Sequence, residues 1–135
     1  MNQKNNIAVI IPAAGSSNRF KREIPKQFQK IGNETVLEIT VKIFLELSYV
    51  KNVFVAIDQN ETLIQSQSFI NHPKVIITQG GSTRSESVHN AVLEIENEID
   101  IIVIHDAARP WVSKKFIEEQ ISQFTKDKSV QGLYP

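Results

Sequence analysis

Small residues and cations gather in a stretch near the N-terminus that suits a phosphate-rich ligand. Residues 12–19 read Pro-Ala-Ala-Gly-Ser-Ser-Asn-Arg and follow an apolar run. Small side chains let backbone N–H groups come close to a triphosphate. Arg19 and Lys26, with Lys21 and Arg22 between them, add cations of the kind that stabilise charge developing on a phosphoryl group. A tight polar turn is the alternative for 12–19, and a solvated charged loop is the interpretation we favour for Lys21 and Arg22.

A second stretch of this kind begins at Gly80-Gly81, between a strand-like run and a helix expected to open near Ser85. Flexible backbone and a helix N-terminus therefore meet at the end of a strand, which again suits an anion. Arg84 and Ser87 fall in the first helical turn. We expect Ser85 to cap the helix and Ser87 to contact a base or a phosphate.

A third candidate is His105-Asp106-Ala107-Ala108-Arg109-Pro110, which follows another apolar run. The Asp106 carboxylate stands where a nucleotide ribose or hydrated Mg²⁺ would be met, but it could equally pair with Arg109 or cap the turn. His105 is expected to be packed and hydrogen-bonded, because a phosphate nucleophile needs no proton removed. His72 is expected in a loop and His89 on a helix surface, and no pair of histidines has metal-ligand spacing.

The elements that must position these loops alternate between strand and helix. Nearly continuous β-branched runs predict strands buried on both faces of a parallel sheet. A capping box at Thr35 and Glu38 opens the first helix, and a fifth strand is expected to begin at 130–135. The alternation predicts an α/β fold: a doubly wound, mostly parallel sheet in three Rossmann-like layers, with ligands beyond the carboxyl ends of the strands. The predicted strands are 7–11, 53–57, 75–78 and 101–104, and the further helices are 85–97, 113–124 and, more weakly, 61–70.

Composition limits the partners. The 135 residues suit one domain, and 15 Lys and Arg against 15 Asp and Glu give zero net charge, so neither a nucleic-acid polymer nor an acidic membrane surface is expected as partner. The absence of cysteine excludes disulfides, thiolate metal sites and a cysteine nucleophile. No apolar stretch approaches the roughly 20 residues of a membrane-spanning helix, and no signal peptide is evident. We expect a cytoplasmic protein.

Together these motifs resemble the 2-C-methyl-D-erythritol 4-phosphate cytidylyltransferases of the non-mevalonate isoprenoid pathway. The resemblance covers essentially the whole chain, and four motifs in order and at matching spacing are far more specific than any one of them. The motifs are Pro12-Ala13-Ala14-Gly15 with Arg19, Pro25-Lys26-Gln27-Phe28, the segment from Gly80 to Val88, and the segment from His105 to Pro110.

The resemblance implies a nucleotidyltransferase fold and an in-line attack by the acceptor phosphate on the α-phosphorus of Mg-CTP, with pyrophosphate leaving. Arg19 and Lys26 match the catalytic cations, and Asp106 matches a residue near the metal, reached through water. The nucleotide-binding residues that it implies line the triphosphate, the cytosine and the ribose: Pro12, Ala13, Ala14, Gly15, Ser16, Ser17, Gly80, Gly81, Ser82, Arg84, Ser87, Asp106 and Ala107.

Two departures and one truncation qualify this expectation. Ser17 stands where a second Gly is common, which disfavours a close approach of the loop to phosphate at that position. Ser82 stands where some members carry Asp, so a Ser or a backbone carbonyl must accept from the cytosine amino group if CTP is preferred. Family members continue into a second half that completes the acceptor site and pairs subunits. We therefore expect 1–135 to be an incomplete nucleotide-binding domain, with a homodimer for the full-length form.

Two alternatives stay open at this point. A ribitol-5-phosphate cytidylyltransferase would share the loops and the chemistry, with another small polyol phosphate as acceptor. A CTP-binding fragment or pseudoenzyme would keep the nucleotide site without turnover.

Overall fold

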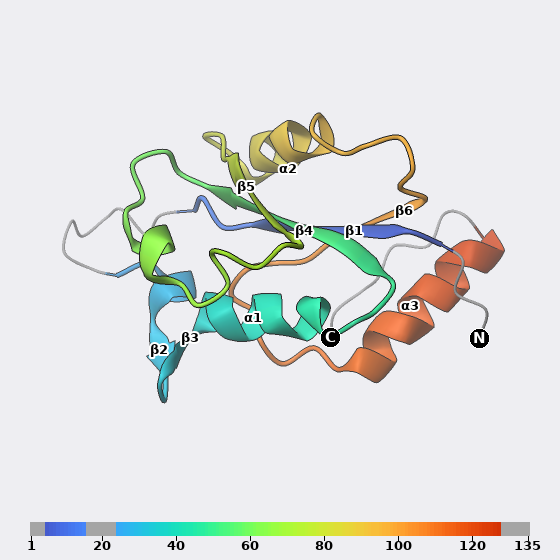
Figure 1. Cartoon of the computed structure of the whole chain (residues 1–135), viewed down its shortest axis with the longest axis horizontal. Helices are drawn as coiled ribbons and strands as arrows, with labels where there is room; N and C mark the ends of the chain where they lie inside the picture. Colours follow the sequence, from blue (N-terminus) through green and yellow to red (C-terminus); the bar gives the residue numbers. More distant parts are fainter. Residues whose placement is uncertain (1–4, 16–23, 128–135) are drawn as a thin grey trace.

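A four-stranded parallel sheet forms the centre of the molecule. The computed structural model describes residues 5–15 and 24–127 (Figure 1). Its strands run in the order β5-β4-β1-β6, and β1 pairs with both β4 and β6. The strand bounds are β1 Ile7–Pro12, β4 Val50–Ile57, β5 Val75–Gln79 and β6 Ile101–Ile104. The four strands expected within the described ranges are confirmed.

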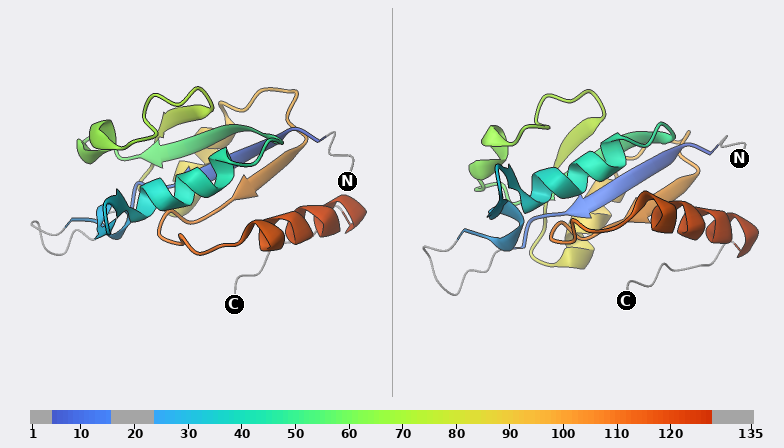
Figure 2. Two further views of the ribbon diagram at one scale, coloured as in Figure 1. Left: turned by 60° about the horizontal axis from the view of Figure 1, so that its bottom comes forward. Right: turned by 90° about the horizontal axis from the view of Figure 1, so that it is seen from below.

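Helices cover both faces of this sheet. Helix α2 (Arg84–Val92) lies on one face, while α1 (Val36–Leu45) and α3 (Lys114–Asp127) lie on the other (Figures 1 and 2). The chain winds from β1 to β4 and β5 on one side of β1, then returns to place β6 on the other side. This arrangement confirms the predicted doubly wound, three-layer α/β fold.

The core explains the apolar character of the central strands. Ile7, Val9 and Ile11 of β1 join the cluster that packs against α1 and α3, whereas Ala8 and Ile10 join the smaller cluster beneath α2. All five are 0% exposed, as expected for a strand covered on both faces. The edge strand β6 differs: Ile102 and Ile104, which pair with Ala8 and Ile10 and so face the α2 side of the sheet, are exposed.

The capping box that begins α1 is confirmed. Glu38 N donates to Thr35 Oγ1 at 3.0 Å, and Thr35 N donates to Glu38 Oε1 at 2.8 Å. Partial burial acts to raise the pKa of Glu38, but backbone hydrogen bonds from Thr35 and Ser68 outweigh it and lower the pKa. The cap therefore favours the ionised carboxylate.

Three of the expected boundaries were wrong. Helix α2 ends at Val92 rather than at 97, because Glu94, Glu96 and Glu98 place negative charge at its C-terminal end. The weak candidate 61–70 holds one 3-10 turn, η2 (Leu63–Ser66), because the side chains of Ser66 and Gln67 donate to Leu63 O and compete with helical hydrogen bonds. Helix α3 extends to Asp127, three residues beyond its expected end.

Two small features complete the described chain. A 3-10 turn, η1 (Lys26–Phe28), precedes a two-stranded antiparallel hairpin of β2 (Lys30–Ile31) and β3 (Glu34–Thr35). The strand expected at 130–135 lies outside the described residues. Within the described ranges, no helix combines the length and the apolar character needed to cross a membrane.

Candidate active site

Three loops meet at the carboxyl edge of the sheet, as the strand-end rule predicts. They are residues 13–15 after β1, residues 80–83 between β5 and α2, and residues 105–110 after β6. The first two touch directly. A Cβ placed on Gly80 would overlap the Cβ of Ala14, so only a glycine lets these two backbones come so close.

The second loop is held by Ser87. Gly81 N donates to Ser87 Oγ at 2.9 Å, and Ser87 is buried. A hydroxyl has one donor and two acceptor sites, so the Ser87 O–H is still able to donate elsewhere. The predicted base contact of Ser87 stays a prediction, and its role in shaping the loop is an observed one.

The cap of α2 was predicted wrongly. Thr83 is the N-cap, with an extended backbone, and its Oγ1 accepts from Glu86 N at 3.1 Å. Ser85 is the second residue of the helix and lies inside the first turn rather than at the cap. Ser82 bonds Glu86 through both its backbone N–H and its hydroxyl, each at 3.2 Å. The hydroxyl oxygen of Ser82 also has lone pairs that can accept a hydrogen bond, and the amino group of cytosine would require such an acceptor.

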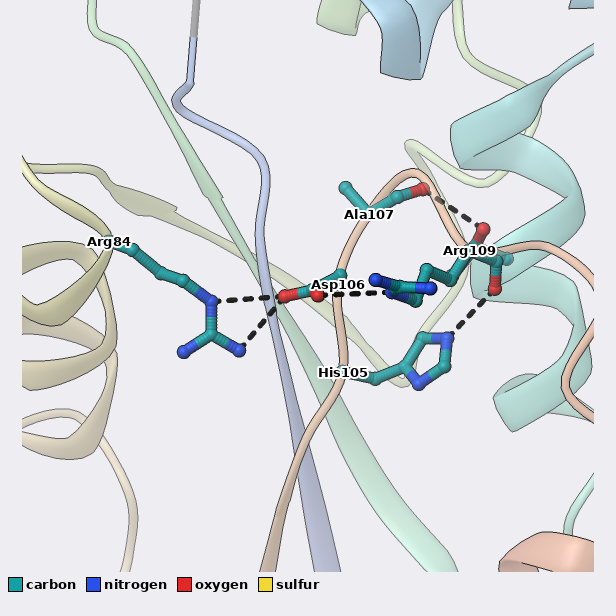
Figure 3. Close-up of polar contacts among 6 residues, drawn as sticks. Arg84, His105, Asp106, Ala107 and Arg109 are labelled. Atoms are coloured by element: carbon teal, nitrogen blue, oxygen red, sulfur yellow. Dashed lines mark hydrogen bonds and ion pairs between the residues drawn. The ribbon is translucent and has the colours of Figure 1, made fainter. Parts of the chain in front are cut away.

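Asp106 lies between two arginines at the start of the third loop (Figure 3). Its Oδ1 is 2.9 Å from Arg84 Nη2 and 3.0 Å from Arg84 Nε, and its Oδ2 is 3.3 Å from Arg109 Nε. Partial burial acts to raise the pKa of Asp106, but hydrogen bonds and charge from Arg84, then from Arg109, outweigh it and lower the pKa. The carboxylate is therefore ionised, and Arg84 ties the second loop to the third.

His105 supports the third loop from below. Its Nε2 is 2.8 Å from Arg109 O (Figure 3). Its ring packs edge-on against Phe44, with the ring centroids 5.2 Å apart. Because a carbonyl only accepts, Nε2 carries the hydrogen. Burial lowers the pKa of His105, so the neutral ring is favoured. The prediction of a packed, hydrogen-bonded His105 is confirmed, as are the loop position of His72 and the exposed helical position of His89.

Thr40 is a supporting residue that sequence reasoning missed. Its side chain is fully buried on α1, and its Oγ1 lies 3.0 Å from Ala107 O and 3.0 Å from Val36 O. Ala107 itself is 6% exposed, so its side chain faces the core. The sequence feature that could have indicated this role is a threonine within an otherwise apolar face of the helix.

Of the two predicted catalytic cations, Lys26 is described by the structure and Arg19 is not. Lys26 is exposed in η1, and its neighbour Gln27 bonds the carbonyls of the 13–15 loop, so the turn that carries Lys26 adjoins that loop. Ser16, Ser17 and Arg19 lie outside the described residues, and their roles stay predictions. Pro12 ends β1, and Ala13 N continues the ladder by donating to Ala56 O at 2.8 Å.

A groove of about 430 Å³ extends away from this rim, between β6 and α3. Asp106, Arg84 and Arg109 lie at its polar end, while Phe116, Phe124 and other apolar side chains line the rest. A triphosphate needs donors and cations, so the rim of the three loops is the better nucleotide site.

Mg²⁺ was predicted near Asp106. Across residues 5–15 and 24–127, no group of three or more His, Cys, Asp or Glu side chains could hold a metal ion. Mg²⁺ that arrives on a nucleotide needs only one or two protein carboxylates beside the phosphates. Asp106 is the rim carboxylate predicted for that lesser role, and both of its oxygens already bond Arg84 or Arg109, so contact with the ion through water fits this arrangement better than direct coordination.

A doubly wound parallel sheet with small-residue loops and cations at its carboxyl edge has the architecture of a nucleotide-binding α/β domain. The family model for 2-C-methyl-D-erythritol 4-phosphate cytidylyltransferase matches residues 7–133. The chain belongs to this family.

Individual relatives agree with that assignment. The chain is 38% identical over 108 residues to the 2-C-methyl-D-erythritol 4-phosphate cytidylyltransferase of Wigglesworthia glossinidia brevipalpis, covering 80% of this chain and 47% of the relative. The Escherichia coli O1:K1 / APEC enzyme of that name is 36% identical, with 77% and 44% covered. The crystal structure of the Francisella tularensis enzyme superposes with a TM-score of 0.70 at 37% identity, covering 94% of this chain and 54% of that one. The chain thus spans about half the length of the curated relatives it matches.

Proposed function

We propose that residues 1–135 form the nucleotide-binding part of an enzyme that transfers CMP from CTP to 2-C-methyl-D-erythritol 4-phosphate and releases pyrophosphate. One observation of the structure carries the proposal. Ala14 against Gly80 and Arg84 against Asp106 join three strand-end loops into a single rim. The family membership supplies the reaction, and the relatives bear the name of the methylerythritol enzyme rather than of a ribitol enzyme.

The transfer requires charge stabilisation and no general base. An oxygen of the acceptor phosphate bonds to the α-phosphorus while the bond from that phosphorus to the bridging oxygen of pyrophosphate breaks. Negative charge accumulates around the α-phosphorus, and Lys26 and Arg19 are the cations proposed to stabilise it. His105 is assigned a supporting role, because its Nε2 hydrogen is held by Arg109 O, its ring packs on Phe44, and the proposed reaction needs no proton removed.

Mg²⁺ is proposed to accompany CTP and to neutralise part of the triphosphate charge. Asp106 would reach the ion through water, because its carboxylate oxygens already bond Arg84 and Arg109. We further propose a cytoplasmic location for the enzyme and a homodimer for its longer form, both on the strength of the family resemblance.

Pyrophosphate release tests the proposal. The chain and any longer form of it are assayed with Mg²⁺ and CTP, with methylerythritol 4-phosphate or ribitol 5-phosphate as acceptor. Release with the first acceptor alone is expected. Release with ribitol phosphate alone would overturn the acceptor assignment. CTP binding without release from any form would show a binding module.

The variant Lys26→Ala tests the proposed chemistry in the active form. Its turnover should fall about 100-fold or more, with a much smaller change in CTP affinity, as for a group that acts in the transition state. Lys30→Ala is the matched control, because Lys30 is also exposed and lies four residues later in β2. Equal turnover in the two variants would remove Lys26 from the mechanism.

A further inference from the structure

A buried glutamine fastens the first loop to the turn that carries Lys26. Gln27 is 8% exposed, and its Nε2 lies 2.9 Å from Ala13 O and 2.8 Å from Gly15 O. An amide nitrogen carries two hydrogens, so each carbonyl receives a hydrogen bond of its own. Both donors of Gln27 are therefore committed to this loop.

The turn itself is anchored on the hydrophobic core. Phe28 is 4% exposed within the main core cluster, and its N–H donates to Pro25 O at 2.9 Å. Lys26 directly precedes these two anchored residues in the same turn, and its side chain is exposed. The position of Lys26 relative to the loop therefore depends on the Gln27 amide and on the packing of Phe28.

The two hydrogen bonds also orient the loop. A peptide unit is planar and trans, so the Ala13 carbonyl and the Ala14 N–H point in opposite directions. Because Gln27 holds the Ala13 carbonyl toward the interior, the Ala14 N–H is directed away from it. The Gly15 carbonyl is likewise turned toward the buried amide. Two oxygens that would repel a phosphate are thereby withdrawn from the loop's outer side.

We propose that Gln27 is a positioning residue of the nucleotide site: it orients the 13–15 loop and holds Lys26 beside it without touching the ligand. This inference rests on the proposed function. It assigns a role to a side chain that is neither one of the catalytic cations nor one of the nucleotide contacts expected above.

The test compares Gln27→Met, which keeps the length of the side chain and removes both donors, with Gln27→Asn, which keeps the amide on a shorter stem. Gln67→Met is the matched control. Gln67 is also buried, at 4% exposed, but its Nε2 donates to Leu63 O and its Oε1 accepts from Thr35, away from the rim. Three readouts are needed: CTP affinity by calorimetry, urea unfolding, and hydrogen exchange of residues 13–15, which include the Ala13 N–H that donates to Ala56 O.

We expect Gln27→Met to weaken CTP binding about tenfold or more and to speed exchange at residues 13–15. Gln27→Asn should lie between it and the wild type, and this variant decides the matter if Gln27→Met fails to fold. Gln67→Met should lower stability while leaving CTP affinity and exchange at 13–15 unchanged. Wild-type affinity together with wild-type exchange in both Gln27 variants would overturn the inference.

The exchange readout separates this inference from the proposed function. If the wild-type chain binds no CTP, the proposed function fails for this form, and exchange at residues 13–15 still decides the role of Gln27 in holding the loop. Faster exchange in a Gln27 variant but not in Gln67→Met supports that role. Unchanged exchange in both Gln27 variants contradicts it.

Discussion

Replacing Gly80 with alanine should force apart the two loops that meet at the rim. The added methyl group would overlap Ala14 Cβ, and it would also lie 3.1 Å from Ser87 Oγ and 3.4 Å from the carbonyl carbon of Ile57. The Ile57 backbone belongs to a central strand and cannot yield easily. Gly80 is held in place because its N–H donates to Ile57 O. The Ala14 loop must therefore be the part that moves outward.

The expected magnitude follows from two opposing effects. Inserting a methyl group into a closely packed contact costs about 1–3 kcal/mol. Replacing glycine lowers the conformational entropy of the unfolded chain, which stabilises the folded state by about 0.4–1 kcal/mol. The net loss should be about 1–2 kcal/mol, which lowers the urea midpoint by roughly 0.5–1 M for a protein of this size.

Urea unfolding of a double-mutant cycle measures this effect. Gly80→Ala, Ala14→Gly and the double variant are compared with the wild type. In the Ala14→Gly background the cost of Gly80→Ala should fall below about 0.5 kcal/mol, because the overlapping methyl group is gone. Gly15→Ala is the matched control, since a Cβ there meets nothing within 4 Å. Gly80→Ala with wild-type stability, or an equal cost in both backgrounds, would refute the reasoning.

Three further predictions concern the third loop. Thr40→Val should lower the free energy of unfolding in urea by about 1–3 kcal/mol, because it leaves the Ala107 carbonyl without its buried donor. Thr40→Ser should recover most of this loss, and equal losses in the two variants would contradict this explanation. Because the folded pKa of His105 is lowered, its contribution to stability is complete above its ordinary pKa of 6.5 and is lost as pH falls from there toward the folded value. His105→Gln should flatten that decline, and an unchanged pH profile would exclude His105 as its cause. Arg84→Gln should raise the pKa of Asp106 toward its ordinary value in a carboxyl NMR titration, and an unshifted titration would show that Arg84 is not the cation that lowers it.

The elements of the fold could be read from local patterns. The continuous apolar runs identify β1 and β4, because a strand covered on both faces carries apolar side chains on both sides. The Thr35 and Glu38 box marks the start of α1, because both of its hydrogen bonds lie within three residues. The rule that ligands lie beyond the carboxyl ends of parallel strands also placed the three loops on one edge.

The cap and the end of α2 were predicted wrongly because neighbouring residues favour different positions for them. Thr83 and Ser85 are both good capping residues, and only the backbone conformation at residue 83 decided between them. Periodicity in the second helix continued past Val92, but the acidic residues that follow oppose the helix dipole.

The partners within the site were decided by the tertiary structure. Arg84 and Asp106 are 22 residues apart, and Thr40 and Ala107 are 67 apart, so no spacing in the chain predicts either contact. The pairing of Gln27 with the 13–15 loop likewise depends on where the core holds Phe28. The residue types at the rim follow from the sequence alone. Their contacts follow from the order in which the sheet brings β5, β1 and β6 side by side, because a hydrogen bond forms only between groups that the fold places about 3 Å apart.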